Sequence, residues 1–199
     1  MRTAAAPPPS SGSPSLALIE VASIARGYVV ADAMVKKAPV TLLQCAPVTP
    51  GKLIVLVGGA VAEVDEAFAA GLAAAGDRII DKLFLAQAHE QLGAAIAGNP
   101  AAGRSAVDAL GIVEMATVAA AVRAADAAAK AARVYIIEMR LGRGLGGKGF
   151  FILSGPLAEI EAAVLAASGA VDPCLLTATE IIGAPHADFT VTLATGGRL

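Results

Sequence analysis

The first half of the chain alternates short apolar runs with helical patterns. Apolar runs of about four to eight residues predict strands, and apolar positions at i and i+4 spacing predict helices. The pattern predicts strands at Leu16–Val21, Val40–Cys45, Leu53–Val57 and Arg78–Leu85, and helices at Ala25–Lys37 and along the face Val61, Val64, Phe68 and Leu72. Pro39 is expected to end the first helix, Pro47–Gly51 to form a loop, and Gly58-Gly59 to turn the chain.

The second half of the chain repeats this order. Ile19-Glu20 recurs as Val113-Glu114, and Lys36 recurs as Lys130, both 94 positions later. Gly51-Lys52 then recurs as Gly147-Lys148, 96 positions later, which a two-residue insertion just before the Gly-Lys pair explains. Self-similarity at a fixed spacing indicates a duplicated domain. The linker chemistry of Gly98–Ser105 (GNPAAGRS) places the boundary between the copies.

Each copy has the element order β-α-β-β-α-β, the split-βαβ or ferredoxin-like arrangement. The fold class is therefore α/β in the broad sense and α+β in the strict one, with two tandem ferredoxin-like domains. This arrangement puts both helices on one face of an antiparallel sheet. The other face must be covered or left in solvent, which favours assembly with other subunits. We divide the chain into an arm at 1–15, a first domain with linker at 16–104, a second domain at 105–188, and a tail at 189–199.

Composition narrows the possible partners. Hydrophobic residues make up 56% of the chain and charged residues only 16%, with a net charge of -2. So apolar a chain is expected to hide surface against other subunits, and it lacks the basic footprint that nucleic-acid binding requires. The apolar run Leu53–Ala62 is too short to span a membrane. Met1–Ser15 is rich in Pro, Ser and Ala and has no leucine-rich core, so we expect a flexible arm and not a secretory signal.

One glycine-rich segment resembles a phosphate-binding motif. Gly142–Gly149 reads GRGLGGKG and contains both G-x-G-x-x-G and G-x-x-x-x-G-K. The residue after Lys148 is Gly149 and not the Ser or Thr that would hold magnesium, and the run Phe150–Leu153 predicts a strand where a phosphate site needs a helix. We therefore predict a tight glycine-rich turn. A trimeric ferredoxin-like regulator that binds a nucleotide at Gly142–Lys148 remains the alternative function.

No other residues form a recognisable reaction centre. His89 and His186 follow the last strand of each copy at near-equivalent positions, which favours packing or hydrogen bonding over metal ligation. The equivalent carboxylates Glu20 and Glu114 are expected to be satisfied by backbone or by the neighbouring copy. Cys45 and Cys174 form no metal pattern and are interpreted as reduced, packed thiols. No nucleophile and base stand at motif spacing, so we expect no enzyme, no cofactor and no metal.

The residues of the first helix resemble a known family. Ala31–Lys36 reads ADAMVK, which is similar to the opening signature of the bacterial microcompartment shell domain, and Ile112–Lys130 carries a second version of it. The non-permuted order, the stretch Pro50-Gly51-Lys52 and the segment Gly144–Lys148 resemble the tandem-domain, trimeric (BMC-T) type, as in the tandem shell proteins of propanediol-utilising compartments. The resemblance covers about residues 16–186.

The resemblance implies a structural and transport role in the cytoplasm, within a bacterial microcompartment shell. Three chains would form a homotrimer with a pseudo-hexameric outline, which contacts other shell proteins (hexameric and pentameric tiles) and passes small metabolites through a central pore. Lys36 and Lys130 match the lysine at the tile edge. The implied pore loops contain Val48, Thr49, Pro50, Gly51, Arg143, Gly144, Leu145 and Gly146.

Two departures from the family pattern qualify this expectation. Some tandem relatives have a cysteine where Thr49 stands, and three copies of it hold an iron–sulfur cluster, so this chain is expected to lack the cluster. An electron-transfer shell protein is therefore disfavoured. The family often has Pro-Arg-Pro-His after the last strand, whereas the copies here have Gln87-Ala88-His89 and Gly183-Ala184-Pro185-His186. Both lack the arginine that helps contacts between tiles.

Overall fold

The computed structural model describes residues 15–100 and 108–194, arranged as two compact units that divide between Ala88 and His89. Most of the expected N-terminal arm, part of the Gly98–Ser105 linker and the end of the expected tail lie outside the described residues. Each unit is considered by itself below. No helix in the described ranges has the length and apolarity needed to cross a membrane.

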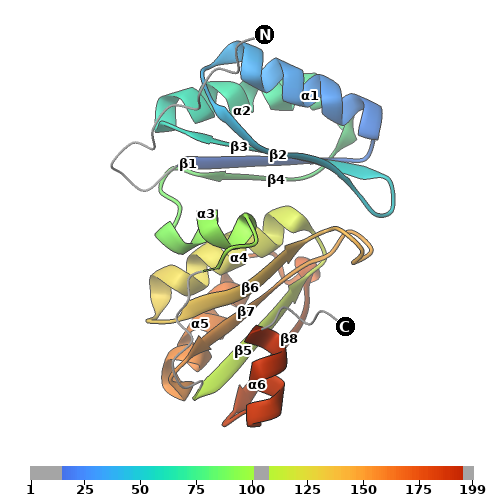
Figure 1. The fold of residues 1–199 in the computed structure, drawn as a ribbon. Coiled ribbons are helices and arrows are strands. Elements are labelled where there is room, and N and C mark those ends of the chain that lie inside the picture. The colour runs from blue at the N-terminus through green and yellow to red at the C-terminus, as the bar shows by residue number, and fades with distance from the viewer. Residues whose placement is uncertain (1–14, 101–107, 195–199) are drawn as a thin grey trace. The chain divides into compact units, whose positions relative to one another are not determined.

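The first unit has the predicted order of elements (Figure 1). Its elements are β1 (Ser15–Val21), α1 (Ile24–Lys37), β2 (Thr41–Val48), β3 (Lys52–Gly59), α2 (Val61–Ala75), a 3-10 turn η1 (Gly76–Arg78) and β4 (Ile79–Leu85). The strands form one antiparallel sheet in the order β2-β3-β1-β4. This is the ferredoxin-like topology that the sequence predicts.

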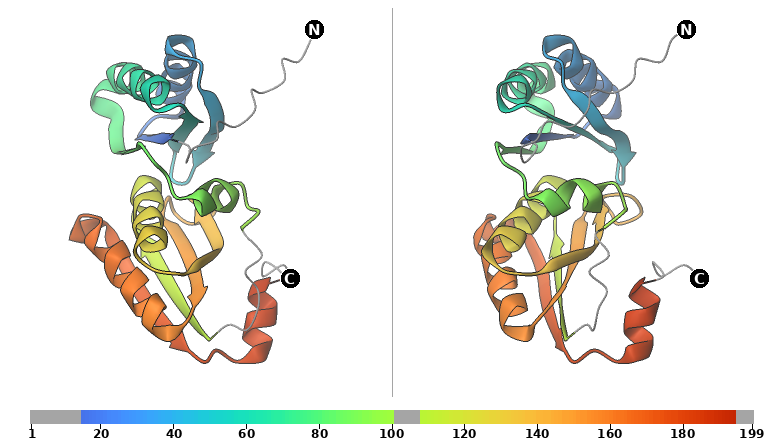
Figure 2. Two further views of the ribbon diagram at one scale, coloured as in Figure 1. Left: turned by 90° about the vertical axis from the view of Figure 1, so that its left-hand side faces the viewer. Right: turned by 60° about the vertical axis from the view of Figure 1, so that its left-hand side comes forward.

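The second unit repeats this topology and adds a helix at each end. Its elements are α3 (Glu90–Ile96), β5 (Ala109–Met115), α4 (Val118–Ala131), β6 (Tyr135–Leu141), β7 (Gly149–Gly155), α5 (Leu157–Gly169), a 3-10 turn η2 (Pro173–Leu175), β8 (Leu176–Gly183) and α6 (Ala187–Ala194). The sheet order is β6-β7-β5-β8, equivalent to that of the first unit. Helices α4 and α5 share one face of the sheet, and α3 packs beside α4 and β6 (Figure 2). The duplication is therefore confirmed.

The core of the first unit lies between its sheet and its two helices. Alternate residues of β1 and β3 point toward the helices, because successive side chains of a strand face opposite sides. The buried cluster consists mainly of Ala17, Ile19, Val21, Leu53, Val55 and Val57 from the sheet, Val30 and Met34 from α1, and Val64 and Ala67 from α2. The hydroxyl of Ser23 caps α1 at the amide of Arg26, and Thr117 caps α4 equivalently at Ala120.

Several local predictions were wrong. Strand β2 runs on through Pro47 and Val48, since β2 is an edge strand on which a proline costs no sheet hydrogen bond. Gly58-Gly59 belongs to β3 and pairs with β1, so the turn follows it. Val61 is exposed because it opens α2 before the buried face begins, and Arg78 lies in η1.

Candidate functional site

The loop between β2 and β3 is a tight turn with exposed residues at its tip. The amide of Gly51 donates to the carbonyl of Val48 at 3.0 Å, and Gly51 has a φ of 107°, a conformation that favours glycine. Thr49, Pro50 and Gly51 are exposed, whereas Val48 is buried. Thr49 is therefore an exposed residue at the tip of the loop.

The equivalent loop of the second unit is longer and rich in glycine. Positive φ angles occur at Gly142, Gly144, Gly146 and Gly147, and the amide of Gly142 donates to the carbonyl of Lys148 at 2.9 Å to close the loop. Arg143, Gly144 and Gly146 are exposed. The chain continues directly into strand β7. The prediction of a glycine-rich turn between two strands is confirmed.

Leu145 is the one half-buried residue at the tip of this longer loop. It lines a pocket of about 350 Å³ together with Ile112, Glu114, Lys148 and Phe150. These residues come from β5, β7 and the loop itself, so the loop folds back over the sheet face that lies opposite α4 and α5. This contact gives the glycine-rich segment an apolar anchor.

A glutamate–lysine pair stands at the base of each loop. Lys52 bonds Glu20 at 3.2 Å, and Lys148 bonds Glu114 at 2.6 Å, so the two pairs occupy equivalent positions in the repeats. The Glu20 side chain is 0% exposed and that of Lys52 is 17% exposed, whereas the second pair is more open to solvent. The expectation that backbone or the other copy satisfies these carboxylates missed these partners, because lysine and glutamate come together only through strand pairing. Lys148, the lysine of the phosphate-binding alternative, is thus already neutralised.

The two predicted edge lysines pair with an aspartate one helical turn earlier. Lys36 bonds Asp32 at 2.6 Å on α1, and Lys130 bonds Asp126 on α4. The spacing of i to i+4 brings such side chains together on one helix face. Asp32 is 57% exposed, but Asp126 is only 7% exposed. The same motif therefore has two different surroundings in the repeats.

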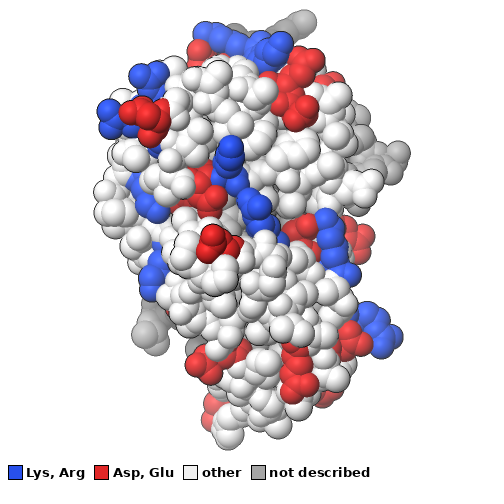
Figure 3. Space-filling model, turned by 180° about the vertical axis from the view of Figure 1, so that it is seen from behind, with Lys and Arg blue, Asp and Glu red and all other residues white. Residues whose placement is uncertain are grey.

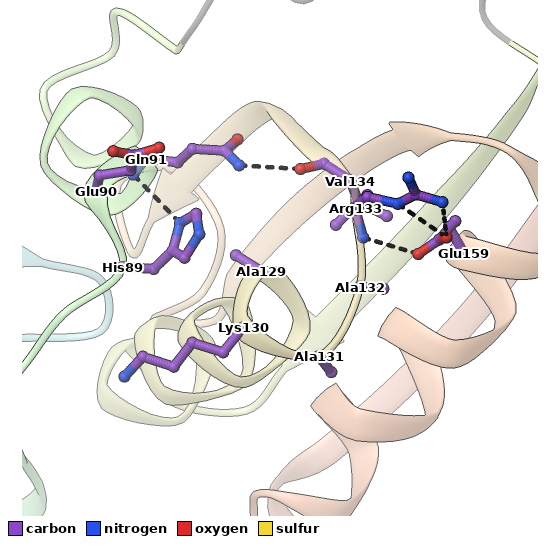
Figure 4. A pocket seen from close by; sticks show the side chains of 10 residues that line it. All are labelled: His89, Glu90, Gln91, Ala129, Lys130, Ala131, Ala132, Arg133, Val134 and Glu159. Carbon is purple, nitrogen blue, oxygen red and sulfur yellow. Dashed lines mark hydrogen bonds and ion pairs between the residues drawn. The ribbon is translucent and has the colours of Figure 1, made fainter.

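The end of α4 borders an open, polar pocket of about 500 Å³ (Figure 4). It is lined by His89, Glu90 and Gln91, by the segment 129–134, and by Glu159. The backbone amide of Arg133 donates to Glu159 at 2.8 Å, and its guanidinium adds a second contact at 3.1 Å. These bonds hold the pKa of the Glu159 carboxyl below its usual range. Lys130 thus stands beside a pocket with charges of both signs.

Both histidines serve as helix caps. The Nδ1 atom of His89 accepts from the amide of Gln91 at 3.4 Å, and that of His186 accepts from the amide of Asp188 at 3.3 Å. The prediction of a hydrogen-bonding role is confirmed. No group of three or more His, Cys, Asp or Glu side chains with metal-binding geometry occurs within the described ranges.

The described surface has no strong charge asymmetry on the face drawn in Figure 3. Lysine, arginine and acidic side chains alternate there and leave broad uncharged areas between them. A nucleic-acid site would gather cations on one stripe or patch. This face presents small, mixed groups of charge.

Comparison with known proteins identifies the fold of both units. The BMC domain family matches residues 15–88 and again residues 109–185. The chain belongs to the bacterial microcompartment shell proteins. It is 38% identical over 176 residues to the bacterial microcompartment shell protein PduT of Citrobacter freundii, which spans 87% of this chain and 94% of that protein.

Two solved structures share the fold of this chain. A crystal structure of a microcompartment protein from Desulfitobacterium hafniense has 40% sequence identity and a TM-score of 0.80, and covers 90% of this chain and 99% of its own. A fused, permuted hexameric shell protein from the RMM microcompartment shares the fold, with a TM-score of 0.59 and 24% identity over 78% of this chain and 83% of its own. Tandem BMC domains therefore account for nearly the whole described chain.

The two thiols of this shell protein lie in different settings. Cys45 is half-buried on β2, and burial raises its pKa. Cys174 is exposed on η2, so the prediction of a packed thiol was wrong for this residue. A hydrogen bond to the side chain of Asp172 raises the pKa of Cys174. Both shifts favour the neutral thiol over the thiolate that binds metals and reacts.

Proposed function

We propose that three copies of this shell protein form a pseudo-hexameric tile with a central pore for small polar or anionic metabolites. Each chain supplies two BMC domains, so a trimer contains six. The tile lies in the shell beside hexameric and pentameric tiles. It acts as a structural and transport component without catalysis of its own and without a bound cofactor.

The pore assignment rests chiefly on the two loops. Both join the second and third strands of a BMC domain, both are anchored by an equivalent glutamate–lysine pair, and both present exposed residues at the tip. Around a threefold axis, three copies of Thr49 would supply hydroxyl groups that donate and accept hydrogen bonds. Three copies of Arg143 would add positive charge. This combination favours neutral or anionic solutes.

The exposed face of α1 supports assembly. Tyr28, Val29 and Val35 are all large apolar residues with 41% or more of their surface exposed. Tyr28 and Val35 share one side of the helix with Ile24, at spacings of four and seven residues, whereas Val29 lies on another side. Contiguous exposed apolar surface of this kind marks a site of protein association. A neighbouring chain in the tile would cover it.

The edge of the tile is assigned to Lys36 and Lys130. The aliphatic stem of a lysine lies along an apolar neighbour while its ammonium reaches carbonyl groups. Asp32 and Asp126 hold these lysines against the helix in the isolated chain. Each lysine would exchange part of that contact for the edge of the next tile.

Sedimentation and electron microscopy test this proposal together. The wild-type chain should sediment as a trimer of about 59 kDa, three times the 19.6 kDa chain, and form sheets at high concentration. The double variant Lys36→Ala/Lys130→Ala should stay trimeric but form fewer or no sheets. The matched control Lys82→Ala alters a lysine on β4 outside the motif. A stable monomer at micromolar concentration contradicts the tile, and sheets equal to wild type from the double variant contradict the edge assignment.

A further inference from the structure

Helix α3 caps the exposed edge of strand β6 in the second unit. The carboxamide nitrogen of Gln91 donates to the carbonyl of Val134 at 2.9 Å, and its oxygen accepts from the amide of Ile136 at 2.9 Å. One side chain thus satisfies two backbone groups of an edge strand, as a peptide group of another strand would. Leu92, the next residue of α3, is fully buried, and so is Ile136.

The start of α3 is fixed by a second contact, to helix α4. The backbone amide of His89 donates to the carboxylate of Asp126 at 2.8 Å. The His89 ring caps α3 by accepting from the amide of Gln91. Helix α3 is therefore held by three kinds of contact: Asp126 on α4, two backbone groups at the edge of β6, and the buried side chain of Leu92.

The first unit carries the receiving half of the same site. Counted at the repeat offset of 94, Asp126 corresponds to Asp32, Val134 to Val40 and Ile136 to Leu42. Within the described residues, no side chain caps the backbone of Val40 or Leu42. Asp32 is 57% exposed and Leu42 is 42% exposed, in contrast to their buried counterparts. The first unit therefore presents this site open.

Helix α6 carries the inserting half. At the offset of 97, His89 corresponds to His186, Gln91 to Asp188 and Leu92 to Phe189. The His186 ring caps α6 at the amide of Asp188, just as His89 caps α3. Phe189 is 42% exposed, whereas its counterpart Leu92 is fully buried. Phe189 therefore exposes an apolar ring at the position where α3 buries Leu92, and nothing in the described chain covers it to the same extent.

We infer that α6 of one chain docks on the α1–β2 edge of a second copy, in the way α3 docks on the α4–β6 edge within the chain. The amide of His186 donates to the partner's Asp32, the carboxylate of Asp188 accepts from the amide of the partner's Leu42, and Phe189 packs on that leucine. This inference rests on the proposed trimer. It identifies a composite site that no single copy completes.

The composite site differs from its internal counterpart in one hydrogen bond. A carboxylate only accepts, whereas a carboxamide donates and accepts. Asp188 therefore reaches the amide of Leu42 but supplies no donor for the carbonyl of Val40. Asp188→Gln should add that bond and tighten association roughly fivefold per interface, as one neutral hydrogen bond of about 1 kcal/mol implies. Phe189→Ala should weaken association, and because Phe189 is exposed in the single chain, folding should be preserved.

Crosslinking between two tagged chains tests the contact directly. In a Cys45→Ala/Cys174→Ser background, one chain carries Leu42→Cys and a differently tagged chain carries Asp188→Cys. After co-expression, a short bismaleimide should join the two tags in one covalent dimer. The control replaces Asp188→Cys with Asp77→Cys, an equally exposed aspartate on η1, and should give no such dimer.

The possible outcomes separate this inference from the proposed tile. A trimer in sedimentation that gives no mixed-tag crosslink overturns the docking of α6 and leaves the tile intact. If a chain that carries both Leu42→Cys and Asp188→Cys crosslinks within itself while the mixed-tag pair does not, the docking is also overturned, because α6 would then cover its own β2. A monomer overturns both the docking and the tile.

Discussion

At the scale of single residues, one close contact between helix and sheet is built differently in the two BMC domains. A Cβ atom on Gly27 of α1 would lie 2.6 Å from the Cβ of Leu53 on β3. At the equivalent place in the second domain the glycine is on the strand, where a Cβ on Gly149 would lie 2.5 Å from the Cβ of Ala121 on α4. Each domain thus has one glycine at this contact, on the helix in the first domain and on the strand in the second.

Gly27→Ala is therefore expected to destabilise the protein although alanine favours helices. Neither Cβ atom can rotate away, so the helix must shift, at a cost of about 1–3 kcal/mol. Gly93→Ala is the control, because the Cβ there meets nothing within 4 Å and should stabilise α3 by about 0.5–1 kcal/mol. Urea unfolding at one fixed chain concentration measures both. A Gly27→Ala protein as stable as wild type would show that α1 has room to move.

The repeats align the glycine of one domain with the larger residue of the other, but the sequence does not show that these positions are in contact. The offsets of 94 and 96 place Gly27 opposite Ala121 and Leu53 opposite Gly149. Nothing local to either glycine indicates that it faces the other segment, because the contact forms only when the helix packs across the sheet. Residue-level prediction succeeded where the signal was local, as for the tight glycine-rich turn at Gly142–Gly149.

At the scale of elements, each β-hairpin is tied to the central strand of its sheet by one lysine. Lys52 reaches the fully buried Glu20, so the first hairpin is held in a setting of low solvent exposure. Lys148 reaches a partly exposed Glu114. An ion pair that loses one partner leaves a large penalty only where the other charge is buried. The two equivalent pairs, Lys52–Glu20 and Lys148–Glu114, therefore allow the effect of burial to be compared directly.

Lys52→Ala should cost about 3 kcal/mol of unfolding free energy, whereas Lys148→Ala should cost less than about 1 kcal/mol. Both remove the same side chain from equivalent positions, so the difference reports the burial of the carboxylate left behind. Lys52→Ala/Glu20→Gln should recover much of the loss, since the amide carries no charge. Chemical denaturation of the three variants measures this. Equal costs for the two lysines would contradict the role of burial.

The sequence predicted the six regular elements of each repeat and missed the two terminal helices. Strands and long helices have a periodic signal of their own, whereas α3 and α6 span only about two turns each. Helix α3 is positioned by Gln91 and His89 through bonds to Val134, Ile136 and Asp126, more than thirty residues away. Short helices held by distant partners leave no pattern in their own residues.

At the scale of the whole molecule, the family was predictable because the ADAMVK segment and the repeat lie on the chain itself. The boundary between the two compact units was harder to predict from the sequence. Gly98–Ser105 has the composition of a linker, but the compact units divide between Ala88 and His89, because α3 packs with the second unit. The segment that follows the first BMC domain thus contributes to the second. Composition locates flexible residues, while packing decides which unit a helix joins.

Thr49→Cys tests whether the loop between β2 and β3 lines the pore. If three Thr49 side chains converge on a threefold axis, Thr49→Cys places three thiols close together, a ligand set that suits iron–sulfur clusters. In a Cys45→Ala/Cys174→Ser background, the variant trimer should turn brown on reconstitution with iron and sulfide and show charge-transfer absorbance. Thr41→Cys, at the other end of β2 and also exposed, is the matched control and should stay colourless. A colourless Thr49→Cys trimer whose thiols also fail to form intersubunit disulfides would place Thr49 away from the axis, and would move the pore to the Gly142–Gly147 loop alone.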